Sequence, residues 1–214
     1  MAEAVNAAQA RTTIEDVRRN ELIAATMSVI SVSGFDGTTV RDIARAAGAS
    51  VGSVNYYFAS KDDLVRAAVA ETDARFRTQV REAVVAAVGF PEKLACVVEL
   101  CFPDEAQAGP DWSVFLDFWN QAARHDDYRE IFDEAHSEWI EMLTRVLADG
   151  VKDGSFSLSA SPRDEALGFA AMIDGLALYT RVTTYVNSDT ARRVAKQYID
   201  ELRPKKSQRS RAKR

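Results

Sequence analysis

Hydroxyl, amide and phenol side chains gather between residues 50 and 61, at positions that a short helix would turn toward solvent. Val51, Val54 and Phe58 recur there at helical spacing, which predicts that one face of this helix is buried. The opposite face then carries short or planar polar groups, and such groups form hydrogen bonds with base edges and phosphates. The residues predicted to contact DNA, here and at the neighbouring helix starts, are Thr39, Arg41, Ser50, Gly52, Ser53, Asn55, Tyr56, Tyr57 and Lys61.

Three predicted helix starts and one sharp turn position these side chains. Thr39 and Ser60 each precede an aspartate by three residues, which is the pattern of a capping box. Gly48 ends the first short helix because glycine adopts the left-handed conformation without steric cost, and Ser50 caps the second. A helix, a tight turn and a second helix form the unit that lays its second helix in the major groove. The alternative for this stretch is a small helical domain without a nucleic-acid partner.

Residues 14–66 resemble the DNA-binding domain of TetR-type (TetR/AcrR) transcriptional regulators. The residues that carry this resemblance are the run TVRDIA at 39–44, the turn AGAS at 47–50, and Tyr57-Phe58 followed by Ser60-Lys61. The resemblance implies a DNA-binding regulator of transcription. Asn55 departs from the family, which usually carries an aromatic residue there, and Tyr57 stands where histidine is frequent. These departures concern the operator sequence rather than the ability to bind DNA.

Composition predicts an all-α protein. The 214 residues are 47% apolar, with ten glycines and five prolines, and no run of alternating β-branched residues suggests a strand. No apolar run approaches the roughly 18 residues of a membrane span, and the first ten residues lack a signal-peptide pattern. We therefore expect a cytoplasmic protein without a membrane partner.

Few residues are of the kind that could perform catalysis or hold a metal. His125 and His136 are the two histidines, and on one helix they would lie roughly 16 Å apart, too far to share an ion. Cys96 and Cys101 would point about 140° apart on a helix, so core packing is favoured over a disulfide. No nucleophile elbow or glycine-rich phosphate loop is present. We expect neither an enzyme nor a cofactor.

Charge is distributed unevenly along the chain. The formal net charge is −5, yet residues 204–214 hold six Lys or Arg and no acid, which predicts a basic, disordered tail. That tail would either touch phosphates or only solubilise the chain. Residues 1–66 hold seven Lys or Arg against eight Asp or Glu, so DNA binding would depend on a few placed cations and on dimerisation. The candidate cations are Arg41, Arg45 and Lys61, together with Arg11, Arg18 and Arg19.

Periodicity and capping signals divide the chain into nine predicted helices and three regions. We expect a helix-turn-helix DNA-binding domain at 1–66, with its motif at about 39–58. An effector-binding and dimerising domain would follow at 67–203, and the basic tail at 204–214. The predicted helices cover about 14–33, 39–47, 50–58, 61–88, 92–102, 111–124, 126–153, 162–186 and 189–202.

Aromatic and acidic residues concentrate between residues 90 and 160, where fifteen Asp or Glu face five Lys or Arg. Aromatic faces beside carboxylates suit a cationic guest. Residues 118–154 are similar to the subgroup of TetR-like regulators that includes choline- and betaine-responsive repressors. The alternative is that the aromatics form the core and the acids a solvated face. The predicted ligand-binding residues are Phe76, Trp112, Phe115, Asp117, Phe118, Trp119, His136, Trp139 and Met172.

The last two predicted helices indicate a homodimer, because small and apolar residues wrap more of the helix at 162–186 than one core needs. The stretch in question consists of Leu167, Ala170, Ala171, Ile173, Asp174, Gly175, Leu178 and Tyr179. Two functional hypotheses remain. One is a repressor that binds double-stranded operator DNA and is released by a small-molecule effector. The other is a DNA-binding protein of the same fold without a small-molecule switch, which organises the chromosome or answers to a protein partner.

Overall fold

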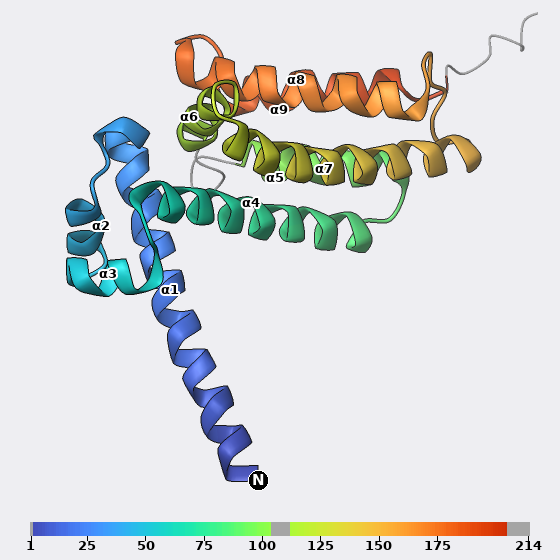
Figure 1. Ribbon diagram of the computed structural model, residues 1–214. Coiled ribbons are helices and arrows are strands. Elements are labelled where there is room, and N and C mark those ends of the chain that lie inside the picture. The colour runs from blue at the N-terminus through green and yellow to red at the C-terminus, as the bar shows by residue number, and fades with distance from the viewer. Residues whose placement is uncertain (1, 104–111, 205–214) are drawn as a thin grey trace, which may run out of the picture. The chain divides into compact units, whose positions relative to one another are not determined.

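The computed structural model describes residues 2–103 and 112–204, and side chains from residue 14 onward except that of Ser113. In these residues the chain forms nine α-helices and no strand (Figure 1). The helices are α1 (Ala2–Gly37), α2 (Val40–Ala46), α3 (Val51–Tyr57), α4 (Lys61–Ala86), α5 (Phe90–Cys101), α6 (Trp112–Ala122), α7 (Asp126–Lys152), α8 (Pro162–Val182) and α9 (Ser188–Glu201). The all-α prediction is confirmed. The predicted basic tail and the Arg11 side chain lie outside the described residues.

Two helices differ clearly from their predicted bounds. The predicted start of the first helix after Thr13 is wrong, because α1 begins at Ala2. The sequence before Thr13 contains five alanines, whose high helix propensity extends the helix past a capping signal. The regular part of α1 is interrupted at Gly34, which has φ 68° and allows the chain to bend. Helix α8 ends at Val182 rather than at residue 186. The backbone of Thr183 is extended, and its side-chain hydroxyl donates a hydrogen bond to the carbonyl of Tyr179.

The described chain divides into two compact units. The first contains residues up to Arg75 together with 113–132, and so joins α1, α2, α3 and the first half of α4 to most of α6 and the start of α7. One core cluster of this unit lies under α2 and α3 and includes Leu22, Ile43, Val54 and Leu64. A second cluster includes Ile30, Phe35, Val114, Phe118 and Tyr128, and packs α6 and the start of α7 against α1 and α4.

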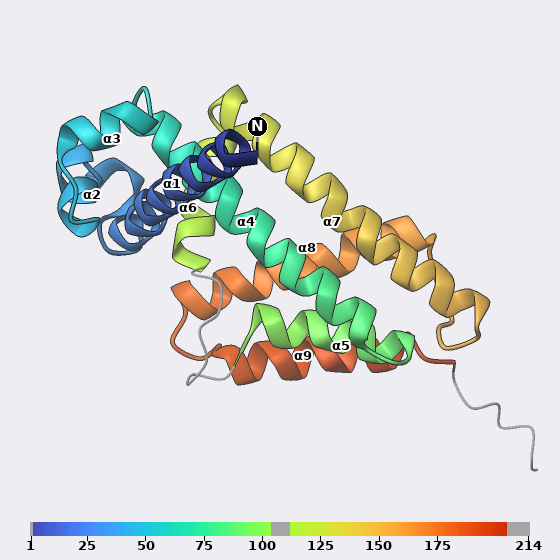
Figure 2. The same cartoon turned by 90° about the horizontal axis from the view of Figure 1, so that it is seen from below.

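The second unit contains residues 76–112 and 133 onward. Its core consists of apolar residues from α4, α5, α7, α8 and α9, with Leu94, Leu143 and Phe169 fully buried. Helices α5, α8 and α9 pack on one another (Figure 2). Cys101 is buried in this core and Cys96 packs against it, and both are free thiols, as the packing interpretation predicts. Burial raises the pKa of the Cys101 thiol, and the nearby Asp174 adds to the rise.

None of the helices among the described residues is long and apolar enough to cross a membrane.

Candidate functional site

The two short helices α2 and α3 are held in place by the predicted caps. The Asp42 amide donates to the Thr39 hydroxyl oxygen at 3.2 Å, and the Ser53 amide donates to the Ser50 hydroxyl oxygen at 3.0 Å. Between the helices Gly48 has φ 58°, the left-handed conformation that the sharp turn requires. Local signals within three or four residues therefore determine this helix-turn-helix.

Helix α3 buries one face and exposes the other. Val54 is 1% exposed, whereas Tyr56 is 74% exposed, and Gly52 and Asn55 are also exposed. Tyr57 is half-buried against the core and meets the Tyr56 ring edge-on at 5.0 Å between centroids. Val51, predicted for the buried face, is instead 39% exposed at the first residue of α3. The solvent-facing surface of α3 therefore presents one aromatic ring, one amide, the Val51 side chain and a stretch of backbone without a side chain.

The carboxyl of Asp42 has two partners on α2 and at its cap. It accepts a hydrogen bond from the Thr39 hydroxyl at 2.5 Å and pairs with Arg45 at 2.9 Å. The Thr39 hydroxyl is the main reason that the pKa of Asp42 is lowered, and Arg45 lowers it further. Arg41 is exposed and makes no ion pair with any described residue. Arg41 is therefore the more available of the two α2 arginines for a phosphate.

Lys61 has a structural partner that its sequence position does not indicate. Its ammonium group donates to the backbone carbonyl of Phe35 at 3.2 Å. The backbone amide of Phe35 donates to a carboxylate oxygen of Asp117 on α6, also at 3.2 Å. Phe35 follows the bend at Gly34, so Lys61 and Asp117 together hold the end of α1. Asp117, predicted as a ligand-binding residue, thus contacts the backbone beside the helix-turn-helix.

Several arginines of the first unit already contact other side chains. The Arg19 guanidinium lies over the Phe58 ring at 5.5 Å, and Arg18 pairs with Glu21 at 2.6 Å. Arg66 pairs with Asp63 at 3.0 Å and also contacts Asp127 at the start of α7. These contacts orient side chains and leave few unpaired positive charges on this unit.

The nine predicted ligand-binding residues divide between the two compact units. Phe115, Asp117, Phe118 and Trp119 belong to the first unit, and Phe76, Trp112, His136, Trp139 and Met172 belong to the second. Phe118 is 4% exposed and lies 6.0 Å from the Tyr128 ring, so it is part of a core cluster. Phe115 is also buried, and Trp119 packs against that cluster.

In the second unit the predicted residues are half-buried. The Trp112 indole donates to the carbonyl of Cys101 at 3.0 Å. Phe76, Trp139 and Met172 pack against the core. His136 lines a hollow on α7 and the start of α8, and burial lowers the pKa of its imidazole although Asp133 opposes the shift. Within the described residues, no group of three His, Cys, Asp or Glu is arranged to hold a metal ion.

Two family models match the chain over separate ranges. Residues 22–68 match the model for bacterial regulatory proteins of the tetR family, and residues 90–204 match that for the C-terminal part of BetI-type transcriptional repressors.

Relatives and solved structures match nearly the full chain. The HTH-type transcriptional regulator BetI of Paraburkholderia phymatum is 30% identical over 88% of this chain and 94% of its own length. The HTH-type transcriptional regulator PksA of Bacillus subtilis is 26% identical over 86% of this chain and 89% of its own. A regulator from Saccharomonospora viridis, solved in complex with choline, superposes with a TM-score of 0.80 at 22% identity, over 88% of this chain and 98% of its own.

Proposed function

Because this chain belongs to the TetR family of transcriptional regulators, with a BetI-type C-terminal part, we propose that it is a dimeric repressor released from its operator by a small cationic effector. As a regulator of the bacterial type, it would act in the cytoplasm, where the bacterial chromosome lies. The observation that carries the DNA-binding half of the proposal is the exposed face of α3, where Tyr56, Asn55 and Gly52 lie opposite the buried Val54.

The proposed dimer is supported by the face of α8 that this chain leaves uncovered. Leu167 is 51% exposed and Val182 is 63% exposed, and Ala171, Gly175 and Leu178 lie between them at helical spacing. Ala170 and Ile173, also predicted for the interface, are buried in the core of the chain itself. We assign the dimer contact to the exposed residues from Leu167 to Val182, because the small residues in the centre of this face allow a second helix to approach closely.

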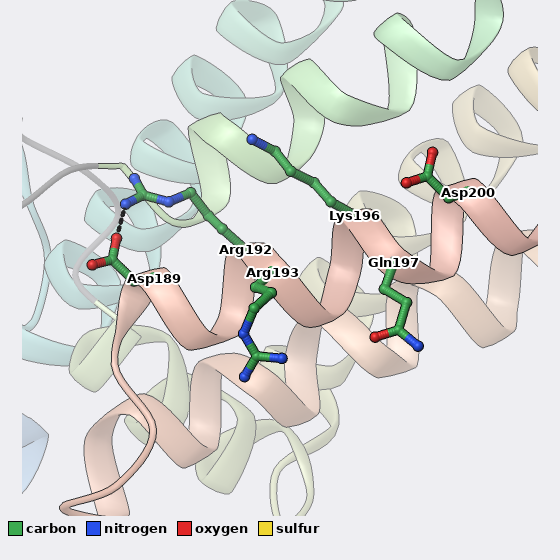
Figure 3. A pocket seen from close by; sticks show the side chains of 6 residues that line it. All are labelled: Asp189, Arg192, Arg193, Lys196, Gln197 and Asp200. Carbon is green, nitrogen blue, oxygen red and sulfur yellow. Dashed lines mark hydrogen bonds and ion pairs between the residues drawn. The ribbon is translucent and has the colours of Figure 1, made fainter.

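Helix α9 has a different outward face. Its buried residues are Ala191, Ala195 and Ile199, and Figure 3 shows Arg193 and Gln197 pointing away from Arg192 and Lys196. This outward face of α9 is polar, so we place the apolar dimer contact on α8. Two copies of the DNA-binding unit would double the small number of available cations, such as Arg41 on α2, which compensates for the balanced charge of each unit.

A cationic effector is supported by the aromatic and acidic character of residues 90–160 and by the fold shared with a choline-bound regulator. The effector can act only by binding one arrangement of the protein more tightly than the other. Asp117 and Lys61 offer a route within the first unit, because both hold the backbone of Phe35 beside the helix-turn-helix. Thus α6, in addition to α4, is positioned to transmit a shift.

The first experiment tests DNA binding. The protein itself selects the operator from genomic DNA, so that no operator sequence is assumed. Genomic fragments that the purified protein retains are sequenced, and one is labelled for anisotropy titrations. We expect Tyr56→Ala to lose most of the affinity, and Tyr185→Ala, which alters a tyrosine of similar exposure outside the DNA-binding unit, to keep it. Equal affinities of the two variants would refute the assignment of α3.

The effector is then tested with choline and with its neutral carbon isostere, 3,3-dimethylbutan-1-ol. We expect choline to weaken operator binding and the isostere to leave it unchanged, because only the former carries charge. Trp119→Ala should remove the response while retaining operator affinity without ligand. If both compounds leave the wild-type titration unchanged but DNA binding persists, the effector half is wrong and regulation without this type of effector is favoured.

A further inference from the structure

A solvent-facing groove in the second unit is lined by the C-terminal half of α4 and the middle of α7. Its volume is about 510 Å³. The lining residues from α4 are Arg77, Arg81, Val84 and Val85, and those from α7 are Glu138, Trp139, Glu141, Met142, Arg145 and Val146. Each set follows helical spacing, so one face of each helix forms one wall.

The floor of the groove is apolar. Val84 and Val146 are each 7% exposed and belong to the core, and Met142 and Trp139 pack against the same core. Val85, in contrast, is 76% exposed on the outer wall. An apolar group of a ligand that lies on this floor would cover Val85 and the half-buried Trp139. The charged side chains of the groove would remain hydrated, so the burial of apolar surface would favour binding.

The rim of the groove carries an excess of positive charge. Three guanidinium groups stand beside two carboxylates. Glu138 contacts Arg77, and Glu141 lies 3.9 Å from Arg145, so both carboxylates already have a cation. Arg81 forms no hydrogen bond or ion pair with any residue in the described part of the chain, although it is exposed at the groove.

We propose that this groove binds an amphipathic anion, namely a carboxylate carried on a short alkyl chain. The planar guanidinium of Arg81 would hold the carboxylate through paired N–H donors, and Arg145 can turn from its long contact with Glu141 to assist. The alkyl chain would lie over Val85, Met142 and Trp139. This site goes beyond the proposed effector, since its ligand has the opposite charge and, of its lining residues, it shares Trp139 alone with the predicted effector-binding residues.

The test uses NMR of the full-length protein with isotope-labelled methionine methyl groups. Met142 lines the groove, whereas Met27 and Met172 do not and serve as internal controls. The probes are octanoate, octan-1-ol and octyltrimethylammonium, which share a chain and differ in charge. We expect octanoate to shift the Met142 signal saturably, and the neutral and cationic probes to bind at least about fivefold more weakly.

Arg81→Gln should reduce octanoate affinity by about fivefold or more, since it removes one charge-assisted contact. The matched control is Arg193→Gln, which alters an exposed arginine of α9 that also has no described ion pair, and it should leave the affinity unchanged. Equal binding of the three probes, equal effects of the two substitutions, or an octanoate shift confined to Met27 or Met172 would each overturn the proposal. No arm requires DNA, so its failure is distinguishable from failure of the repressor proposal.

Discussion

Gly52 on α3 is a glycine for which the folded chain supplies no steric reason. A Cβ atom placed there would lie 3.7 Å from the Ser50 hydroxyl oxygen, an ordinary contact, and the backbone has no positive φ. Glycine inside a helix costs about 1 kcal/mol relative to alanine. We therefore expect the DNA backbone to approach α3 closely at Gly52, on the exposed side of the helix.

We therefore predict that Gly52→Ala raises the free energy of unfolding by about 0.5–1 kcal/mol and weakens operator binding. Urea denaturation and anisotropy titration of the same preparation measure both effects. A variant that is more stable and binds DNA as well as the wild type would show that α3 docks through another part of its surface.

Lys61 combines two roles that substitution can separate. Its hydrogen bond to the Phe35 carbonyl predicts that Lys61→Ala lowers the free energy of unfolding by about 1 kcal/mol. If the ammonium also contacts a phosphate in each protomer, the slope of log affinity against log salt becomes shallower by about 1.8 in a dimer. If the free energy of unfolding falls but the salt dependence of the affinity is unchanged, Lys61 stabilises the end of α1 and does not contact a phosphate.

Among the helices, α8 has an ionisable group where an apolar residue would pack. Asp174 accepts no hydrogen bond from the described residues, and burial raises its pKa from 3.8 to about 6. Because the raised pKa favours the protonated form in the folded state, the associated stability is present below pH 3.8 and is lost as pH rises through 6. At neutral pH the ionised carboxylate therefore destabilises the protein.

Asp174→Asn removes that charge, so we predict an increase of about 2 kcal/mol in unfolding free energy at pH 7.5, allowing for partial exposure. At pH 3, below the pKa of 3.8, the gain should nearly vanish, since the carboxyl is then mostly protonated in both the folded and the unfolded state. Chemical denaturation across this range measures the difference. A gain that is independent of pH would show that side-chain shape, rather than charge, is responsible.

At the scale of the whole molecule, dimerisation determines how many DNA contacts act together. Ala171 lies in the centre of the exposed apolar face of α8, so Ala171→Glu would place a buried charge in the interface. We expect sedimentation at micromolar concentration to show a dimer for the wild type and a monomer for this variant. Operator affinity should fall with it.

The matched control is Gln197→Glu, which adds the same charge to the polar outward face of α9. It should stay dimeric. If both variants remain dimers, the interface lies elsewhere; if the wild type is a monomer, the proposed mode of DNA binding is wrong.

The helix-turn-helix was predictable from the sequence, because the signals that form it are local. The Thr39 and Ser50 caps each act over three residues, Gly48 sets the turn by its own conformation, and Val54 marks the buried face by periodicity. The same locality explains the main error in α1, where a capping pattern at Thr13 competes with a continuous run of helix-forming residues and does not stop it.

Contacts between groups that are distant in sequence became visible in the folded chain and were not predictable before it. Asp117 lies 82 residues from Phe35 and Lys61 lies 26 residues from it, and neither spacing carries a periodic or capping signal. Likewise, the sequence does not distinguish an aromatic residue of a pocket from one of the core. The packing of the folded chain places Phe118 in a core cluster. The predicted effector residues and domain bounds remain predictions, since long-range packing determines a cavity and short-range pattern does not.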